Sequence, residues 1–192
     1  MMKKTAISVL FLVFGLIFSG CLGKELPTIH HYELSLDSNF GKATNSATKN
    51  VRNPQEILYL GTDASLKIAS KKIAYKTNAN TIEYFVKNEW IEPLPLMVDS
   101  LMLKATKQMG FSLASEKKNG IPTLSLNLLD FYYDQKREIV VLNLLVKQNH
   151  TSFLLNQEIK VQSGGFHAII LAMNQAINAA LLESLTSLKN SK

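Results

Sequence analysis

The chain of 192 residues contains one cysteine, one tryptophan, nine glycines and five prolines. A single cysteine excludes a disulfide framework, and so little glycine and proline excludes a collagen-like or low-complexity chain. Hydrophobic residues make up 46% of the sequence, which is too many for a disordered protein. Only the N-terminal stretch is apolar enough for a bilayer, so a multi-span membrane protein is also excluded. A single domain with a buried core remains.

The N-terminus has the plan of a secretory signal peptide. Lys3 and Lys4 form a basic region ahead of an apolar run at residues 6–18, which is too short to span a membrane as a mature helix. Two small residues, serine and glycine, follow the run, as a peptidase site requires. We therefore predict that residues 1–20 are a signal peptide. The alternative is a single N-terminal anchor helix.

The only cysteine directly follows this stretch, and the segment Phe18-Ser19-Gly20-Cys21 resembles a bacterial lipobox. In that class the cysteine is acylated on sulfur and becomes the first mature residue, and several acyl chains anchor far more firmly than one. The resemblance implies lipidation at Cys21 and a lipidated tether over residues 21–31. Leu22 stands where many inner-membrane lipoproteins have aspartate. We therefore expect a lipid-anchored protein at the outer membrane that faces the periplasm.

The charge of the chain is modest. The sequence has 21 basic and 15 acidic residues, and loss of Lys3 and Lys4 with the signal peptide leaves 19 against 15, a net charge of +4. This excess suits contact with anionic headgroups or an acidic partner, or a soluble surface with scattered lysines. No basic block with interleaved aromatics occurs, so we expect no nucleic acid partner.

Hydrophobic patterning predicts one α+β domain over residues 32–188 with a polar surface loop at residues 37–55. The expected fold is a two-layer sandwich, in which a mixed or antiparallel sheet of about five to six strands is packed by two amphipathic helices. The segment 138–147 is apolar at nearly every position and should be a central strand. Candidate strands are Tyr32–Leu36, Ile57–Leu60, Lys72–Lys76, Thr81–Val86, Thr123–Tyr132, Glu138–Lys147 and Thr151–Val161, and candidate helices run from Pro93 to Gly110 and from Phe166 to Leu188.

Reactive side chains are present, but not in a catalytic pattern. His30 and His31 are adjacent and point to opposite sides of an extended chain, which does not suit a zinc site. Asp130, Asp134 and Glu138 surround a turn where solvated charges are more usual than an acid–base pair. We therefore expect no enzyme activity, no metal and no cofactor. Four further features carry no implied chemical role: His150, His167, the pair Gly164-Gly165 and the glycosylation sequon Asn149-His150-Thr151.

An aromatic-rich stretch from Ile73 to Pro95 is the most informative part of the domain. A predicted hairpin carries aromatic side chains and leads into the only tryptophan and a proline-led helix. Two interpretations remain open: the tryptophan packs as a plug between hairpin and helix, or the aromatics form a contact surface for a partner or lipid. The candidate contact residues are Tyr75, Tyr84, Phe85, Trp90 and Pro93.

With the lipobox and the early segment Tyr32-Glu33-Leu34, this stretch resembles the ABC-type transport auxiliary lipoprotein family, the PqiC-like lipoproteins. The family shows an Ile-x-Tyr strand, a Tyr-rich strand, a tryptophan, a proline pair and an amphipathic helix, which correspond here to Ile73–Gly110. Strands and a long helix follow, as in the family. The polar loop at residues 37–55 departs from the family pattern, as does Lys76, where the family often has arginine.

The resemblance implies a non-enzymatic accessory or docking subunit of an MCE-type ABC lipid transport system. In such systems an inner-membrane ABC transporter carries an MCE-domain protein that bridges the periplasm, and the lipoprotein docks its far end. The implied partners are the MCE-domain protein with its ABC transporter complex, phospholipid, and further copies in a homo-oligomeric ring. The alternatives are a structural adaptor of another envelope machine, such as a secretion apparatus or flagellar motor, and an envelope enzyme or small-ligand binder.

We predict that Cys21→Ala leaves the protein unprocessed or mislocalised, because the variant lacks the sulfur that would carry the acyl chain. Membrane fractionation of cells, with immunoblotting for the precursor and mature forms, measures both effects. Normal fractionation of the variant would contradict the lipoprotein interpretation.

Overall fold

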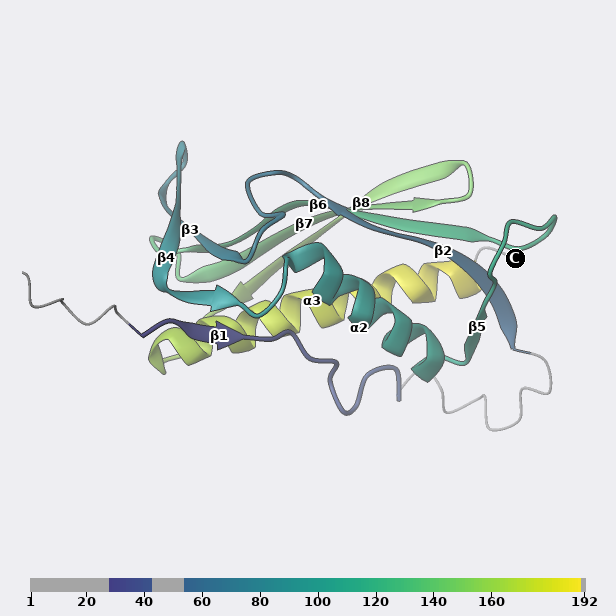
Figure 1. Ribbon diagram of the computed structural model, residues 1–192, viewed down its shortest axis with the longest axis horizontal. Coiled ribbons are helices and arrows are strands. Elements are labelled where there is room, and N and C mark those ends of the chain that lie inside the picture. Colours follow the sequence, from purple (N-terminus) through teal and green to yellow (C-terminus); the bar gives the residue numbers. More distant parts are fainter. Residues whose placement is uncertain (1–27, 43–53, 191–192) are drawn as a thin grey trace, which may run out of the picture.

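The computed structural model of the protein describes residues 28–42 and 54–190 (Figure 1). Cys21 and most of the predicted polar loop lie outside the described residues. The elements of the described part are β1 His30–Tyr32, β2 Gln55–Ala64, β3 Lys72–Asn78, β4 Thr81–Trp90, α2 Leu94–Gln108, β5 Phe111–Leu113, β6 Thr123–Asp134, β7 Ile139–Gln148, β8 Thr151–Lys160 and α3 Gly165–Asn190.

The sheet is organised around β6, which is 12 residues long. One edge of β6 pairs antiparallel with β7, from Leu124↔Gln148 to Asp134↔Ile139. The other edge pairs in parallel first with β2 and then with β3, so these two strands lie one after the other along β6. β5 extends the sheet beyond β2, β4 and β1 extend it beyond β3, and β8 pairs with β7. The sheet is therefore mixed, as predicted.

The sheet has eight strands, more than the five or six expected. β5 was not predicted because a strand of three residues is too short to show an alternating pattern. The predicted strand Tyr32–Leu36 is shifted: β1 begins at His30 and ends at Tyr32. Leu34 is 2% exposed and belongs to the core, although its segment has left the sheet. The alternation of apolar and polar residues in Tyr32–Leu36 thus predicted the burial of Leu34 correctly, but it did not predict that the segment leaves the sheet.

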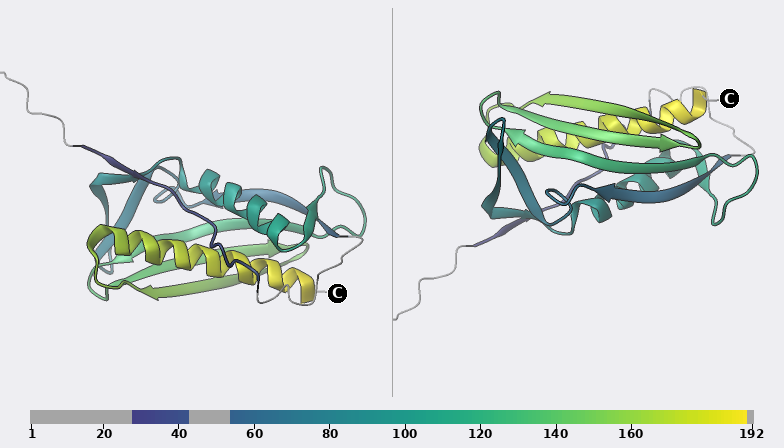
Figure 2. Two further views of the ribbon diagram at one scale, coloured as in Figure 1. Left: turned by 90° about the horizontal axis from the view of Figure 1, so that it is seen from below. Right: turned by 90° about the horizontal axis from the view of Figure 1, so that it is seen from above.

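Both helices cover the same face of the sheet, as Figures 1 and 2 show. α3 packs against β7 and β8, and α2 packs against β2 and β5. Leu124, Leu126 and Leu128 alternate along β6 and are each at most 2% exposed. Burying a side chain of this size contributes about 1.5–3 kcal/mol. The two-layer α+β sandwich is therefore confirmed, and β7 is an internal strand between β6 and β8, as its apolar sequence predicted.

Helix α2 begins where the two prolines predict. Pro93 precedes the first turn, its carbonyl accepts a hydrogen bond from the backbone N–H of Leu96 at 3.0 Å, and Pro95 lies within that turn. The helix ends at Gln108, after which Gly110 adopts a φ of +80° that glycine tolerates at little cost. The side chains buried by α2 are Leu94, Met97, Val98, Leu101, Met102, Ala105 and Thr106.

Helix α3 is 26 residues long. By length and composition alone it is apolar enough to cross a membrane, so the N-terminal stretch is not alone in this property. However, 67% of its most apolar stretch is buried inside the domain. Residues such as Met173, Ile177 and Leu181 have no exposed surface and face the core. Its hydrophobicity is therefore explained by its place as the core helix under the sheet.

We predict that Leu101→Asp unfolds the domain, because it places an unpaired carboxylate at a position that is 1% exposed. The expected loss is about 4 kcal/mol or more in the free energy of unfolding. Leu103→Asp is the matched control, since Leu103 lies on the same helix and is 45% exposed. Thermal unfolding followed by circular dichroism compares the two, and equal melting temperatures would mean that the buried face of α2 is misassigned.

Candidate functional site

The aromatic hairpin of β3 and β4 lies at the end of the molecule where β1 and α3 begin (Figure 1). Between the pairs Ala74↔Tyr84 and Lys72↔Glu89, β3 advances by two residues while β4 advances by five. The extra residues of β4 form a bulge, at which the strand bends sharply in Figure 1. We call this bulge, residues 85–88, the β4 corner.

Four aromatic rings form a row that includes Phe85 of the β4 corner. The ring centroids are 4.6 Å apart for Tyr75 and Phe85, 4.7 Å apart for Phe85 and Phe166, and 5.0 Å apart for Phe166 and Tyr32. All four side chains are only partly buried. The hydroxyl of Tyr75 donates a hydrogen bond to Glu83 at 2.7 Å, and this bond raises the pKa of Tyr75. The row therefore combines apolar rings with polar tips, a mixture that suits a boundary between an apolar phase and water.

The five predicted contact residues do not all belong to this row. Tyr75 and Phe85 do, whereas the hydroxyl of Tyr84 donates to the carbonyl of Lys67 at 2.8 Å. Pro93 lies at the start of α2 and is partly buried.

Trp90 is 1% exposed and lies in the core. Its ring stacks on Phe131 of β6, with 6.3 Å between the centroids and 4° between the planes. The sequence reasoning missed Tyr32 and Phe166 as members of the row. These two residues join the row because β1 and α3 lie against the hairpin. A local sequence pattern does not predict such contacts between distant elements.

After β1, residues 33–42 leave the sheet and run across the helices, as the left panel of Figure 2 shows. We call this segment the strap. Two asparagines one turn apart on α3 bind its backbone. Asn174 and Asn178 each accept a hydrogen bond through Oδ1, from the backbone N–H of Ser35 and of Asp37, both at 2.9 Å. The Nδ2 of Asn178 also donates to the carbonyl of Ser35 at 2.9 Å. The two asparagine amides therefore satisfy backbone N–H and carbonyl groups of the strap that, in a sheet, would hydrogen-bond to a neighbouring strand.

The strap is also held by buried side chains. Leu34 is 2% exposed and Phe40 is 4% exposed, and Gln108 of α2 donates to the carbonyl of Phe40 at 2.9 Å. The strap thus contacts both helices. Upstream of it, β1 runs parallel to β4 with His30 beside Asn88. The chain therefore enters the described domain next to the β4 corner.

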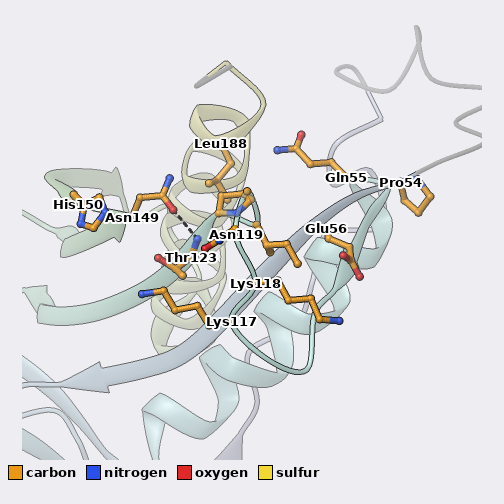
Figure 3. A pocket seen from close by; sticks show the side chains of 13 residues that line it. Pro54, Gln55, Glu56, Lys117, Lys118, Asn119, Thr123, Asn149, His150 and Leu188 are labelled. Carbon is orange, nitrogen blue, oxygen red and sulfur yellow. Dashed lines mark hydrogen bonds between the residues drawn. The ribbon is translucent and has the colours of Figure 1, made fainter.

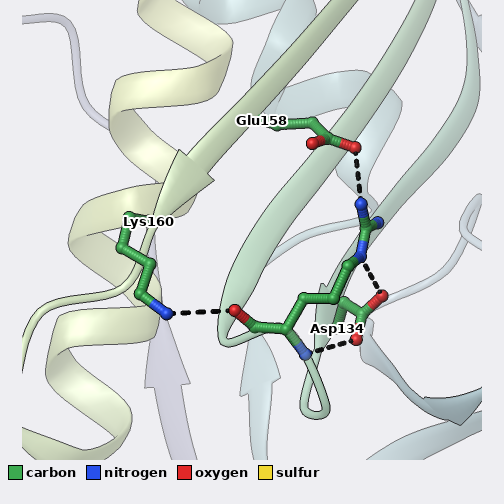
Figure 4. Close-up of polar contacts among 4 residues, drawn as sticks. Asp134, Glu158 and Lys160 are labelled. Atoms are coloured by element: carbon green, nitrogen blue, oxygen red, sulfur yellow. Dashed lines mark hydrogen bonds and ion pairs between the residues drawn. The ribbon is translucent and has the colours of Figure 1, made fainter.

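The three carboxylates that the sequence singled out lie apart, each beside its own cation. The guanidinium of Arg137 donates hydrogen bonds to both Asp134 and Glu158, which Figure 4 shows near the turn that joins β6 and β7. The contacts are Asp130 with Lys67 at 2.6 Å, Asp134 with Arg137 at 2.8 Å, and Glu138 with Lys160 at 3.2 Å.

These contacts set the protonation of the two aspartates. Partial burial by itself raises the pKa of Asp130, but hydrogen bonds from Lys67 and Asn143 outweigh it, so the pKa lies below its ordinary value. Slight desolvation likewise raises the pKa of Asp134, and hydrogen bonds from Arg137 lower it overall. Both groups are ionised at neutral pH and stabilise the turn and the sheet surface as charged partners.

The histidines do not form a cluster. His30 and His31 are both exposed on β1, and Nδ1 of His31 lies 3.3 Å from a carboxylate oxygen of Glu89. His150 lies in the turn between β7 and β8, and His167 lies in the first turn of α3. Across residues 28–42 and 54–190, no group of three or more metal-ligating side chains could hold an ion.

The opposite end of the molecule contains an open hollow of about 830 Å³ (Figure 3). Lys117 and Lys118 line it from the loop before β6, and Glu56 lines it from β2. Oδ1 of Asn149 accepts a hydrogen bond from the backbone N–H of Thr123 at 2.9 Å, so this amide is used to fix the β7–β8 turn. The lining is a mixture of lysines, amides and one carboxylate at a wide mouth, which is typical of a solvated surface, and we assign no ligand to it.

This two-layer arrangement defines the class of fold, and solved structures share it. Protein XCC0632 from Xanthomonas campestris, described as a member of family DUF330, superposes with a TM-score of 0.62 at 15% identity, over 86% of this chain and 96% of that chain. A crystal structure of an uncharacterized protein superposes with a TM-score of 0.61 at 16% identity, over 86% and 99% of the two chains. No family model and no curated protein matches the sequence. At these identities the likeness establishes the fold and not an activity.

We predict that Asn178→Ala loosens the strap, because it removes the acceptor for Asp37 and the donor to Ser35. The expected loss is about 1–3 kcal/mol in the free energy of unfolding for the two hydrogen bonds to the strap. We also expect faster exchange of the Asp37 amide hydrogen. Gln175→Ala is the control, because Gln175 is exposed on the same helix. Hydrogen exchange of the strap read by mass spectrometry, with chemical denaturation, tests both effects. An unchanged exchange rate would show that the asparagines do not hold the strap in solution.

Proposed function

We propose that the protein is a membrane-anchored periplasmic lipoprotein that acts as a non-enzymatic accessory and docking subunit of an MCE-type ABC lipid transport system at the outer membrane. Acylated Cys21 fixes the protein to the membrane, and the domain binds the far end of an MCE-domain bridge. The other proposed partners are phospholipid and further copies of the chain in a ring. The protein performs no covalent chemistry in this proposal and needs no cofactor.

The observation that carries the proposal is the agreement between a sequence feature and a structural one. The lipobox-like segment and the family-like stretch Ile73–Gly110 resemble the auxiliary lipoproteins. Independently, the fold is shared over 86% of the chain with a DUF330 protein of nearly the same extent. Because one fold hosts many functions, the fold likeness supports the kind of domain and the sequence resemblance supports the partner.

The strap supports a docking role through its mechanics. A subunit that is anchored at its N-terminus and holds a bridge at its surface is pulled between these two points. Here the incoming chain is bound to α3 by Asn174 and Asn178 and is buried at Leu34 and Phe40 before it continues. A pull on the tether that detached β1 from the sheet would therefore still be resisted by the contacts of the strap with both helices.

The experiment that tests the proposal is a crosslinked pull-down from intact cells, read by mass spectrometry, with wild type and Cys21→Ala compared at equal expression. We expect an MCE-domain protein and its ABC transporter subunits with wild type. Their recovery should fall sharply with Cys21→Ala, because the variant no longer resides at the membrane where the bridge ends.

Recovery of secretion or flagellar motor components in place of an MCE-domain protein would transfer the function to the adaptor alternative and leave the fold intact. Recovery of the MCE-domain protein at equal yield with both variants would show that docking does not depend on the anchor. The two results separate the identity of the partner from the role of Cys21.

A further inference from the structure

The length of the tether limits how far the domain can stand from the membrane. Six residues lie between Cys21 and Thr28, the first described residue, so seven Cα-to-Cα steps join the two. Fully extended, such a segment spans about 25 Å. Thr28 and Ile29 lead into β1, whose first residue lies beside Asn88 of β4. If Cys21 carries the lipid anchor, as proposed above, the end of the domain with the β4 corner is therefore the end at which the tether is attached and the end that it keeps within about 25 Å of the bilayer.

This end exposes apolar side chains that the fold does not need. Val86 is 83% exposed at the β4 corner, and Ile29 is 46% exposed. The parallel register of β1 and β4 pairs His30 with Asn88, which places Ile29 level with Lys87, the residue after Val86. The bulge in β4 is the cause, because its extra residues carry Val86 away from the sheet. The partly buried aromatic row is joined to the corner through Phe85.

Basic side chains surround the same corner. Lys71, Lys72 and Lys87 are all exposed, and within the described residues none of them forms a salt bridge. Two carboxylates of this end have partners within the domain: Glu83 accepts a hydrogen bond from Tyr75, and Glu89 lies 3.3 Å from His31. Glu33 and Glu92 are exposed. The ammonium of Lys72 lies 5.2 Å from the centre of the Tyr84 ring, a contact that leaves its charge unneutralised. The three lysines can therefore bind anions outside the domain, such as lipid phosphates.

We propose that the β4 corner, with Val86 and Ile29 at its tip and Lys71, Lys72 and Lys87 around it, is a second membrane contact that docks on the phospholipid surface holding the acyl anchor. The apolar tip enters the interface while the lysines bind headgroup phosphates, and the aromatic row lies at the boundary with water. The acyl chains alone leave the domain free to tumble on its tether. The corner fixes its orientation and turns the opposite end, with β5 and the open hollow, toward the periplasm. This inference rests on the proposed lipid anchor.

The test uses the full lipidated protein, reconstituted in vesicles of phosphatidylethanolamine and phosphatidylglycerol. With Cys21 acylated, a cysteine introduced by Val86→Cys is the only free thiol and takes a nitroxide spin label. Leu113→Cys is the control, because Leu113 is an exposed apolar residue of β5 at the opposite end. Collision rates with molecular oxygen and with a water-soluble nickel reagent locate each label. We expect the Val86 label to favour oxygen over nickel severalfold more than the Leu113 label does.

Lys87→Glu in the Val86→Cys protein tests the headgroup contact. We expect the equilibrium constant for corner contact to fall about fivefold or more, because each basic group near an anionic surface contributes about that factor. Lys117→Glu at the opposite end should leave the Val86 label unchanged. A result in which Lys87→Glu and Lys117→Glu behave alike would overturn the assignment of the lysines to phosphates.

The outcomes separate this inference from the function proposed above. In one outcome the protein floats with the vesicles, but the Val86 label is as accessible to nickel as the Leu113 label. This result would overturn the membrane contact and leave the lipid anchor unaffected. A Val86 label shielded from both reagents would show that another copy of the chain covers the corner, which also overturns it. Protein that does not float with the vesicles would contradict the lipid anchor itself and, with it, the docking that depends on it.

Discussion

The register of β6 is the constraint on which the rest of the structure depends. This strand pairs with β7 along one edge and with both β2 and β3 along the other, so three partners take their positions from one backbone. Its alternating leucines, Leu124 to Leu128, direct one face of every neighbouring strand toward the helices. A shift of one residue would turn these leucines to solvent, and the loss in burial makes that register the only stable one. The two helices then have a single apolar face on which to pack.

Because β2 and β3 pair with different parts of β6, the two ends of the domain differ. Beyond β2 the sheet continues into β5 and the open hollow, and beyond β3 it continues into β4, β1 and the aromatic row. The incoming chain is attached at the second end, where β1 pairs with β4 and the strap passes onto α3. In the function proposed above, the anchor lies on the side of the second end, and the first end is left for the proposed periplasmic partner.

Sequence patterns were informative wherever a signal was local. Pro93, Gly110 and the spacing of Leu94, Met97 and Leu101 predicted α2 closely, because caps and helical periodicity depend on neighbouring residues. The short gap between the candidate strands Glu138–Lys147 and Thr151–Val161 likewise indicated the hairpin of β7 and β8, and Asn149 in its turn has a φ of 53°. Tyr75 and Phe85 were both among the candidate contact residues of the hairpin, and the structure places their rings in contact.

The sequence by itself therefore determined the two helices, the long strands, the α+β class and the side chains that had to be buried. Only the tertiary structure decided that Leu34 reaches the core through a strap rather than a strand, that Trp90 stacks on Phe131, and that Phe166 completes the aromatic row. The physical reason is the separation in sequence between the residues that interact. Periodicity and capping act between residues a few positions apart, whereas these contacts join residues at least 41 positions apart in the printed chain and form only after β6 has placed their elements side by side.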